Sequence, residues 1–154
     1  MIALVTDSTA PLTHAEAEKF GICVVPHSYT VDGTAYLENY TDENPGYTNR
    51  LSRASRYATA QCTPSAFATA FRQLLAQGCD VLCIVLSSRL SGAWTSAVTA
   101  ARALGNAHIT VLDSHLTAGA LYFALLRTRE ESLRGLSLSQ LSDRFRTIEK
   151  EVGV

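Results

Sequence analysis

Residues 81–92 read VLCIVLSSRLSG, so a run of six apolar residues leads directly into a segment of hydroxyls and glycine. An unbroken run rich in Val, Leu and Ile is typical of a parallel strand that helices cover on both faces. Gly92 then begins an alanine-rich stretch that extends to Leu104, and this stretch predicts a helix. A buried strand, a short loop and a helix in this order predict an α/β fold.

Shorter apolar runs extend this pattern in both directions. Strands are expected over residues 2–5, 22–25 and 109–112, a hairpin over 29–36 around Asp32-Gly33, and helices over 11–20, 63–77, 116–133 and 137–152. Residues 37–61 have no clear periodicity, and a loop with one short helix over 48–55 is expected there. The chain is therefore predicted to form one α/β domain over residues 1–154, with a mostly parallel sheet and helices on both faces.

The composition narrows the classes of function. The chain has 154 residues, of which 47% are hydrophobic and 18% charged, and its net charge of −1 provides no positive field to attract nucleic acid. The amino terminus lacks a signal-peptide pattern, and every apolar run is far shorter than the about 20 residues of a membrane helix. We therefore expect a cytoplasmic protein with no nucleic-acid partner and no membrane span. The four cysteines are expected to be buried thiols, and no set of four metal ligands is apparent.

Hydroxyl and acidic residues follow the ends of the predicted strands. They form four clusters, Thr6 to Thr9, Ser87-Ser88 with Ser91, Asp113-Ser114, and Thr59 to Ser65. Because the carboxyl ends of parallel strands share one edge of a sheet, we expect these clusters to converge on one hollow with an apolar lining. Gly92 begins a helix, whose free amides favour an anion. The clusters contain no Lys and only Arg89, and the chain has no glycine-rich phosphate loop, so a carboxylate is the preferred ligand.

Three other interpretations of these residues remain open. The hydroxyls are also the usual helix caps and turn residues. A hydrolase would use Ser91 as nucleophile with Asp113 and His115, but Ser91 lacks the Gly-x-Ser-x-Gly pattern. Asp113 and His115 also lie so close along the chain that the acid is not expected to orient the imidazole. The third interpretation is an interaction module without a ligand. The remaining histidines, His14, His27 and His108, are expected at the surface or in turns.

Five segments with these residues resemble, in order, the motifs of the DegV family. They are residues 7–9 (DST), 25–36 (VPHSYTVDGTAY), 59–64 (TAQCTP), 87–97 (SSRLSGAWTSA) and 113–114 (DS). The resemblance covers nearly the whole chain and implies the fold of the family's N-terminal domain. It also implies that the family's second domain, which forms the other wall of the lipid site, is absent from this chain.

The resemblance implies a bacterial lipid-binding protein and not an enzyme. In that family the carboxylate of a long-chain fatty acid is held by residues that match Thr59, Ser91 and the Gly92 amide, and a partner fatty acid kinase phosphorylates the bound acid. The acid is the ligand, and no cofactor or metal is implied. A second domain or another chain would close the pocket. Further residues are expected to line or support it, namely Asp7, Ser8, Thr9, Gln61, Thr63, Ser88, Asp113 and Ser114.

Overall fold

The computed structural model describes residues 1–152 and contains two sheets. In chain order the elements are β1 (Ile2–Asp7), α1 (His14–Phe20), β2 (Ile22–Val25), β3 (His27–Val31), β4 (Thr34–Glu38), α2 (Tyr47–Ser52), β5 (Tyr57–Ala60), α3 (Pro64–Ala76), β6 (Asp80–Val85), α4 (Ala93–Leu104), β7 (Ile109–Asp113), α5 (Ala118–Ser132) and α6 (Leu138–Val152). Four parallel strands form the first sheet in the order β2-β1-β6-β7, and the α/β fold predicted from the sequence is confirmed.

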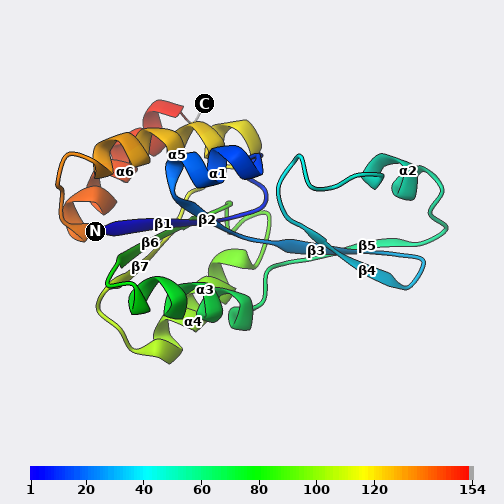
Figure 1. The fold of residues 1–154 in the computed structure, drawn as a ribbon, viewed down its shortest axis with the longest axis horizontal. Helices are drawn as coiled ribbons and strands as arrows, with labels where there is room; N and C mark the ends of the chain where they lie inside the picture. The colour runs from blue at the N-terminus through cyan, green and yellow to red at the C-terminus, as the bar shows by residue number, and fades with distance from the viewer. Residues whose placement is uncertain (153–154) are drawn as a thin grey trace.

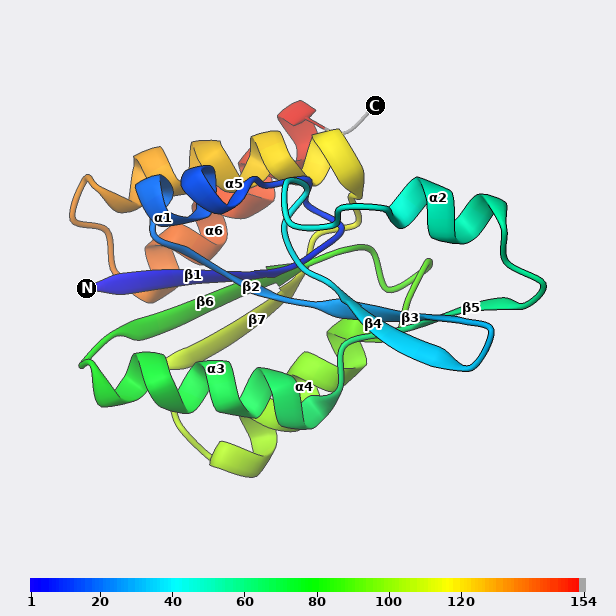
Figure 2. The same ribbon diagram turned by 45° about the vertical axis from the view of Figure 1, so that its right-hand side comes forward.

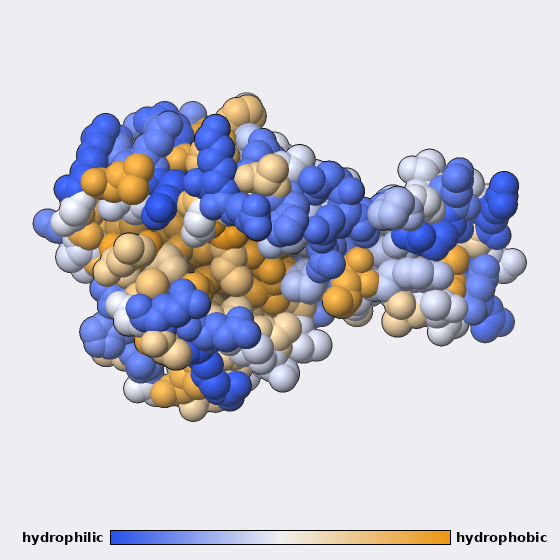
Figure 3. Space-filling model, in the orientation of Figure 1, coloured by the Kyte–Doolittle hydropathy of each residue, from blue (hydrophilic) through white to orange (hydrophobic). Residues whose placement is uncertain are grey.

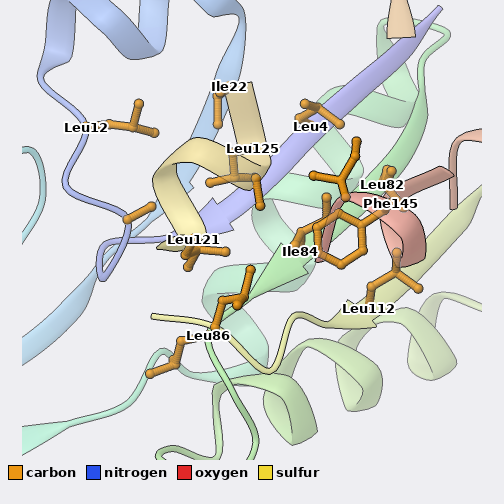
Figure 4. Packing of buried hydrophobic residues seen from close by; sticks show 14 of the residues in the cluster. Leu4, Leu12, Ile22, Leu82, Ile84, Leu86, Leu112, Leu121, Leu125 and Phe145 are labelled. Carbon is orange, nitrogen blue, oxygen red and sulfur yellow. The ribbon is translucent and has the colours of Figure 1, made fainter. Parts of the chain in front are cut away.

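The central strand β6 separates two hydrophobic clusters. Its successive side chains point to opposite faces, so Leu82 and Ile84 belong to one cluster while Cys83 and Val85 belong to the other. All four are fully buried, because helices cover both faces of the sheet. In Figures 1 and 2, α1, α5 and α6 lie on one side of the sheet, and α3 and α4 lie on the other. Figure 4 shows the first cluster, in which Phe145 of α6 packs close to the β6 side chains.

The second sheet forms an arm that extends from the first. Strand β3 follows β2 directly after Pro26, and it pairs with β4 and β5 in antiparallel fashion in the order β4-β3-β5. In Figures 1 and 3, these strands and α2 project from the body. The predicted hairpin is confirmed, because Asp32 and Gly33 both have positive φ, 47° and 88°, as a two-residue turn of type I′ requires.

The arm differs from the sequence-based expectation in one respect, because β5 lies where a loop was expected. All four residues of β5 are exposed, so its sequence has no alternation of buried and exposed positions. A small aromatic cluster stabilises the arm instead. Tyr29 is 2% exposed and stacks on Tyr36 with ring centroids 5.2 Å apart, and the Arg50 guanidinium lies 4.6 Å from the Tyr36 ring centroid.

Two further expectations concern the whole described chain. Within residues 1–152 no helix combines the length and the apolar composition needed to cross a membrane. The same residues contain no cluster of three or more His, Cys, Asp or Glu side chains arranged for a metal ion. The four cysteines are free thiols, but the expectation that all four are buried holds only for Cys62 and Cys83, because Cys23 and Cys79 are partly exposed.

Candidate functional site

A hollow of about 470 Å³ lies where the parallel sheet meets the arm. The residues that line it are Thr9, His27, Glu38, Thr59, Ala60, Gln61, Leu86, Leu90, Ser91 and Gly92. The three residues predicted to hold a carboxylate, Thr59, Ser91 and Gly92, are therefore brought to one place. The lining is more polar than expected, since six of these ten residues have polar side chains.

The exit loop of β6 and the first turn of α4 position Ser91 and Gly92. The amides of Leu90 and Ser91 both donate to the Ser87 carbonyl, at 2.9 and 3.3 Å, which folds the loop into a tight turn. The Ser91 hydroxyl accepts a hydrogen bond from the Ala93 amide at 3.2 Å. The Gly92 amide donates to no acceptor within residues 1–152, and it lies at the N-terminus of a 12-residue helix. An anion at this position would meet a free donor and the positive end of the helix dipole.

The Gln61 side chain lies against the open face of Gly92, so a larger residue at position 92 would displace the end of Gln61. A Cβ atom on Gly92 would lie 2.3 Å from Gln61 Oε1, far inside normal contact distance. The Gln61 amide itself donates to the Ser96 hydroxyl at 3.3 Å, which links the segment after β5 to α4. The arm and the body therefore meet at this pair, and Thr59, two residues before Gln61, faces Tyr29 across the β3–β5 register.

Asp7, at the end of β1, supports the hollow from behind. Its carboxylate is fully buried and accepts hydrogen bonds from the Leu86 amide at 2.7 Å and from the Thr9 amide at 2.9 Å. Burial alone raises the pKa of Asp7, but the His27 ring, 3.4 Å away, and the hydrogen bonds from Thr9 and Leu86 together outweigh it and hold the pKa below its usual value. Asp7 is therefore a carboxylate that joins the ends of β1 and β6.

His27 and Glu38 also line the hollow, and the sequence-based prediction did not include them. His27 was expected at the surface or in a turn, which is wrong, because it is 9% exposed and its amide donates to the Ser8 hydroxyl at 3.0 Å. His27 and Glu38 face each other in the β3–β4 register. The signal in the sequence was the hairpin itself, because counting back from Asp32-Gly33 pairs residue 27 with residue 38.

The other predicted pocket residues divide into two groups. Thr9 and Gln61 line the hollow, and Ser8 lies behind it through its contact with His27. Four residues neither line it nor hydrogen-bond with a residue that does: Thr63 caps α3, Asp113 accepts a hydrogen bond from the Ser88 amide at 3.0 Å, and Ser114 is fully buried and bonds to Leu116. The strand-end clusters thus converge only in part.

The residues of the hydrolase interpretation are not assembled at the hollow. Contrary to the sequence-based expectation, Asp113 does reach His115, with Oδ2 3.4 Å from Nε2, and His115 has a positive φ of 54°. However, the other ring nitrogen of His115 contacts Glu149, and neither Asp113 nor His115 lines the hollow that contains Ser91. Within residues 1–152 the Ser91 hydroxyl has no histidine partner.

Comparison with known proteins places these features in a family. A family model described as uncharacterised proteins of the DegV family matches residues 1–154. A DegV domain-containing protein of Staphylococcus aureus is 27% identical over 97% of this chain, and one of Caldanaerobacter subterraneus is 30% identical over 99%. These matches cover 53% and 55% of the two relatives, so the chain spans about half the length of the curated relatives it matches.

Solved structures agree with this match. A fatty acid binding DegV family protein from Thermus thermophilus is 28% identical, with a TM-score of 0.82 over 97% of this chain and 53% of its own. A DegV lipid binding protein from Thermotoga maritima is 25% identical, with a TM-score of 0.88 over 97% of this chain and 54% of its own. A third structure, also from Thermotoga maritima and described as revealing fatty acid binding, is 25% identical with a TM-score of 0.86 over 95% of this chain and 54% of its own. The chain belongs to the DegV family.

Proposed function

We propose that this chain binds a long-chain fatty acid and holds its carboxylate in the hollow through Thr59, Ser91 and the Gly92 amide. The observation that carries the proposal is that these three groups, from β5 and from the start of α4, line one hollow. The fatty acid binding described for relatives of at least 25% identity supports the choice of ligand. The protein acts as a carrier and has no catalytic role of its own.

The polar groups would determine the orientation of the acid. A buried carboxylate is costly unless it is hydrogen-bonded, and each hydrogen bond to a charged group contributes about 1.5–3 kcal/mol. Two hydroxyls and one free amide therefore mainly offset the loss of hydration, and they favour acids over esters and alcohols. The helix dipole of α4 adds to this preference because Gly92 begins the helix.

The acyl chain would supply most of the affinity. Burial of ten methylenes contributes roughly 8 kcal/mol, at about 0.8 kcal/mol each, before the cost of association is subtracted. The hollow offers Ala60, Leu86 and Leu90 as apolar lining, and Leu90 is 65% exposed. We infer that a second domain or another chain covers Leu90 and the acyl chain, and thereby closes the pocket.

The proposal includes a partner. The resemblance to the family implies that a fatty acid kinase phosphorylates the bound acid, and we propose that this chain presents the carboxylate to such a kinase in the cytoplasm. A fatty acid kinase B3 protein of Streptococcus pneumoniae, loaded with linoleic acid, is similar in fold but only 15% identical, so it supports the fold alone.

The experiment that tests the proposal removes both hydroxyls. Native mass spectrometry would compare lipid retained by the wild type, by Thr59→Ala with Ser91→Ala, and by Ser65→Ala with Thr69→Ala. The last pair is a matched control, because both residues are exposed on α3 and lie outside the hollow. We expect acyl masses on the wild type and the control and at least tenfold less on the double variant. Equal retention by all three would contradict the assignment of the carboxylate site.

A further inference from the structure

The imidazole of His27 lies between the hollow and the buried carboxylate of Asp7. Its Nε2 atom is 3.4 Å from Asp7 Oδ1 and has no aligned hydrogen-bond partner within residues 1–152. His27 is 9% exposed, and it lines the same hollow as Thr59 and Ser91. Since Nε2 is the ring nitrogen close to Asp7, we infer that Nδ1 is the one available to a ligand in the hollow.

The charges around the imidazole are unfavourable for an anion unless the imidazole is protonated. Asp7 approaches from β1 and Glu38 from β4, and both are carboxyl groups. The Cys62 thiol, which follows β5 and donates to the Val25 carbonyl, stays neutral, since burial and the charge of Asp7 raise its pKa to about 12. Leu86 and Ser91 provide no charge. No Lys or Arg of the described chain lines the hollow, so His27 alone among its lining residues can become a cation.

We propose that His27, as an imidazolium held by Asp7, donates from Nδ1 to the bound carboxylate and makes the hollow select ionised acids. This inference rests on the proposed function and identifies a specificity-determining residue of the same site. The Asp7 carboxylate, the imidazolium and the ligand carboxylate form a row of alternating charges. A neutral imidazole with its proton on Nε2 would present a lone pair to the ligand and disfavour it.

A protonated His27 makes anion binding depend on pH. The imidazolium is the form that is held by Asp7 and also donates from Nδ1, so binding of the anion favours protonation of the imidazole. Oleate binding should therefore take up protons, and the affinity should fall as the pH rises. Binding of a neutral alcohol with the same acyl chain must do neither.

The experiment measures oleate and oleyl alcohol binding by calorimetry from about pH 6 to about pH 8, in buffers with different ionisation enthalpies. The proteins are the wild type, His27→Asn, His27→Leu and His108→Asn. His108 is the matched control, because it also pairs with an aspartate, Asp80 at 2.6 Å, but does not line the hollow. Oleate is kept below its aggregation concentration so that its carboxyl stays ionised.

We expect the wild type and His108→Asn to bind oleate with proton uptake and with affinity that falls about tenfold over this range. Both His27 variants should bind oleate about tenfold more weakly near pH 6, without proton uptake, and should bind oleyl alcohol as the wild type does. Should a variant fail to fold, proton uptake by the wild type still decides the question. Oleate binding without proton uptake overturns the role of His27 and leaves the proposed function standing, whereas no oleate binding by any protein overturns both.

Discussion

Replacing Asp7 by Asn tests whether the buried carboxylate joins the two strand ends that shape the hollow. Asp7 Oδ2 accepts the Leu86 amide at 2.7 Å, and Oδ1 accepts both the amide and the hydroxyl of Thr9 at 2.9 and 2.5 Å. The Asn side chain has nearly the same shape but retains one acceptor oxygen, and its NH₂ group would face a donor. At least one buried donor therefore loses its partner, and the charge-assisted bonds become neutral.

The expected loss of stability is large for a change of so few atoms. An unsatisfied buried donor costs about 1–3 kcal/mol, and breaking a buried charged network costs about 3–5 kcal/mol. Because Asp7 is fully buried, solvent does not screen these interactions, and we expect a loss of about 3 kcal/mol. A domain of this kind has a stability of about 5–15 kcal/mol, so the variant should still fold.

The pH dependence provides a second test of the same group. The pKa of Asp7 is lowered in the folded protein. The ionised carboxylate therefore stabilises the fold at pH values above about 4, which is the pKa of an aspartate in the unfolded chain. This contribution is lost as the pH falls through the lower folded pKa. The wild type should therefore lose stability in acid more steeply than Asp7→Asn does.

The assay is urea unfolding followed by circular dichroism at neutral and at acidic pH. The matched control is Asp143→Asn, because Asp143 is an exposed residue of α6. The control should change stability by less than about 0.5 kcal/mol. If Asp7→Asn were as stable as the control at neutral pH, or lost stability in acid as steeply as the wild type, the role assigned to Asp7 would be wrong.

Three further predictions concern the same region. Gly92→Ala places a methyl group against Gln61 and should weaken oleate binding about tenfold in calorimetry, whereas Gly119→Ala, with no atom near its Cβ position, should leave binding unchanged. Cys62, whose pKa is raised to about 12 by burial and by the nearby negative charge, should resist iodoacetamide at about pH 8 until the protein is unfolded, as mass spectrometry of the alkylated peptides would record. A fluorophosphonate probe should leave Ser91 unlabelled, and labelling at that residue would favour the hydrolase interpretation.

Much of the body of the fold could be predicted because burial leaves a periodic pattern in the sequence. Leu82 and Ile84 face one hydrophobic cluster and Cys83 faces the other, so β6 appears as an unbroken apolar run. Strand β5 has no such pattern, because all of its residues are exposed and its backbone pairs only with β3. Sequence periodicity therefore could not reveal β5, the third strand of the antiparallel arm.

The candidate site was predictable where it depends on topology and not where it depends on register. Thr9, Ser91 and Gly92 follow β1 and β6, whose carboxyl ends must lie together in a parallel sheet. His27 and Glu38 reach the hollow because the hairpin pairs them across β3 and β4. The turn at Asp32-Gly33 predicts that pairing, but nothing in the sequence around either residue indicates that the paired end of the hairpin lies against the ends of β1 and β6.

The most direct test of the carboxylate site is a crystal structure of the protein with bound oleate. We predict that the carboxylate oxygens lie about 3 Å from Thr59 Oγ1, Ser91 Oγ and the Gly92 amide nitrogen. A carboxylate bound elsewhere, or an acyl chain whose head points away from the start of α4, would contradict the proposed site.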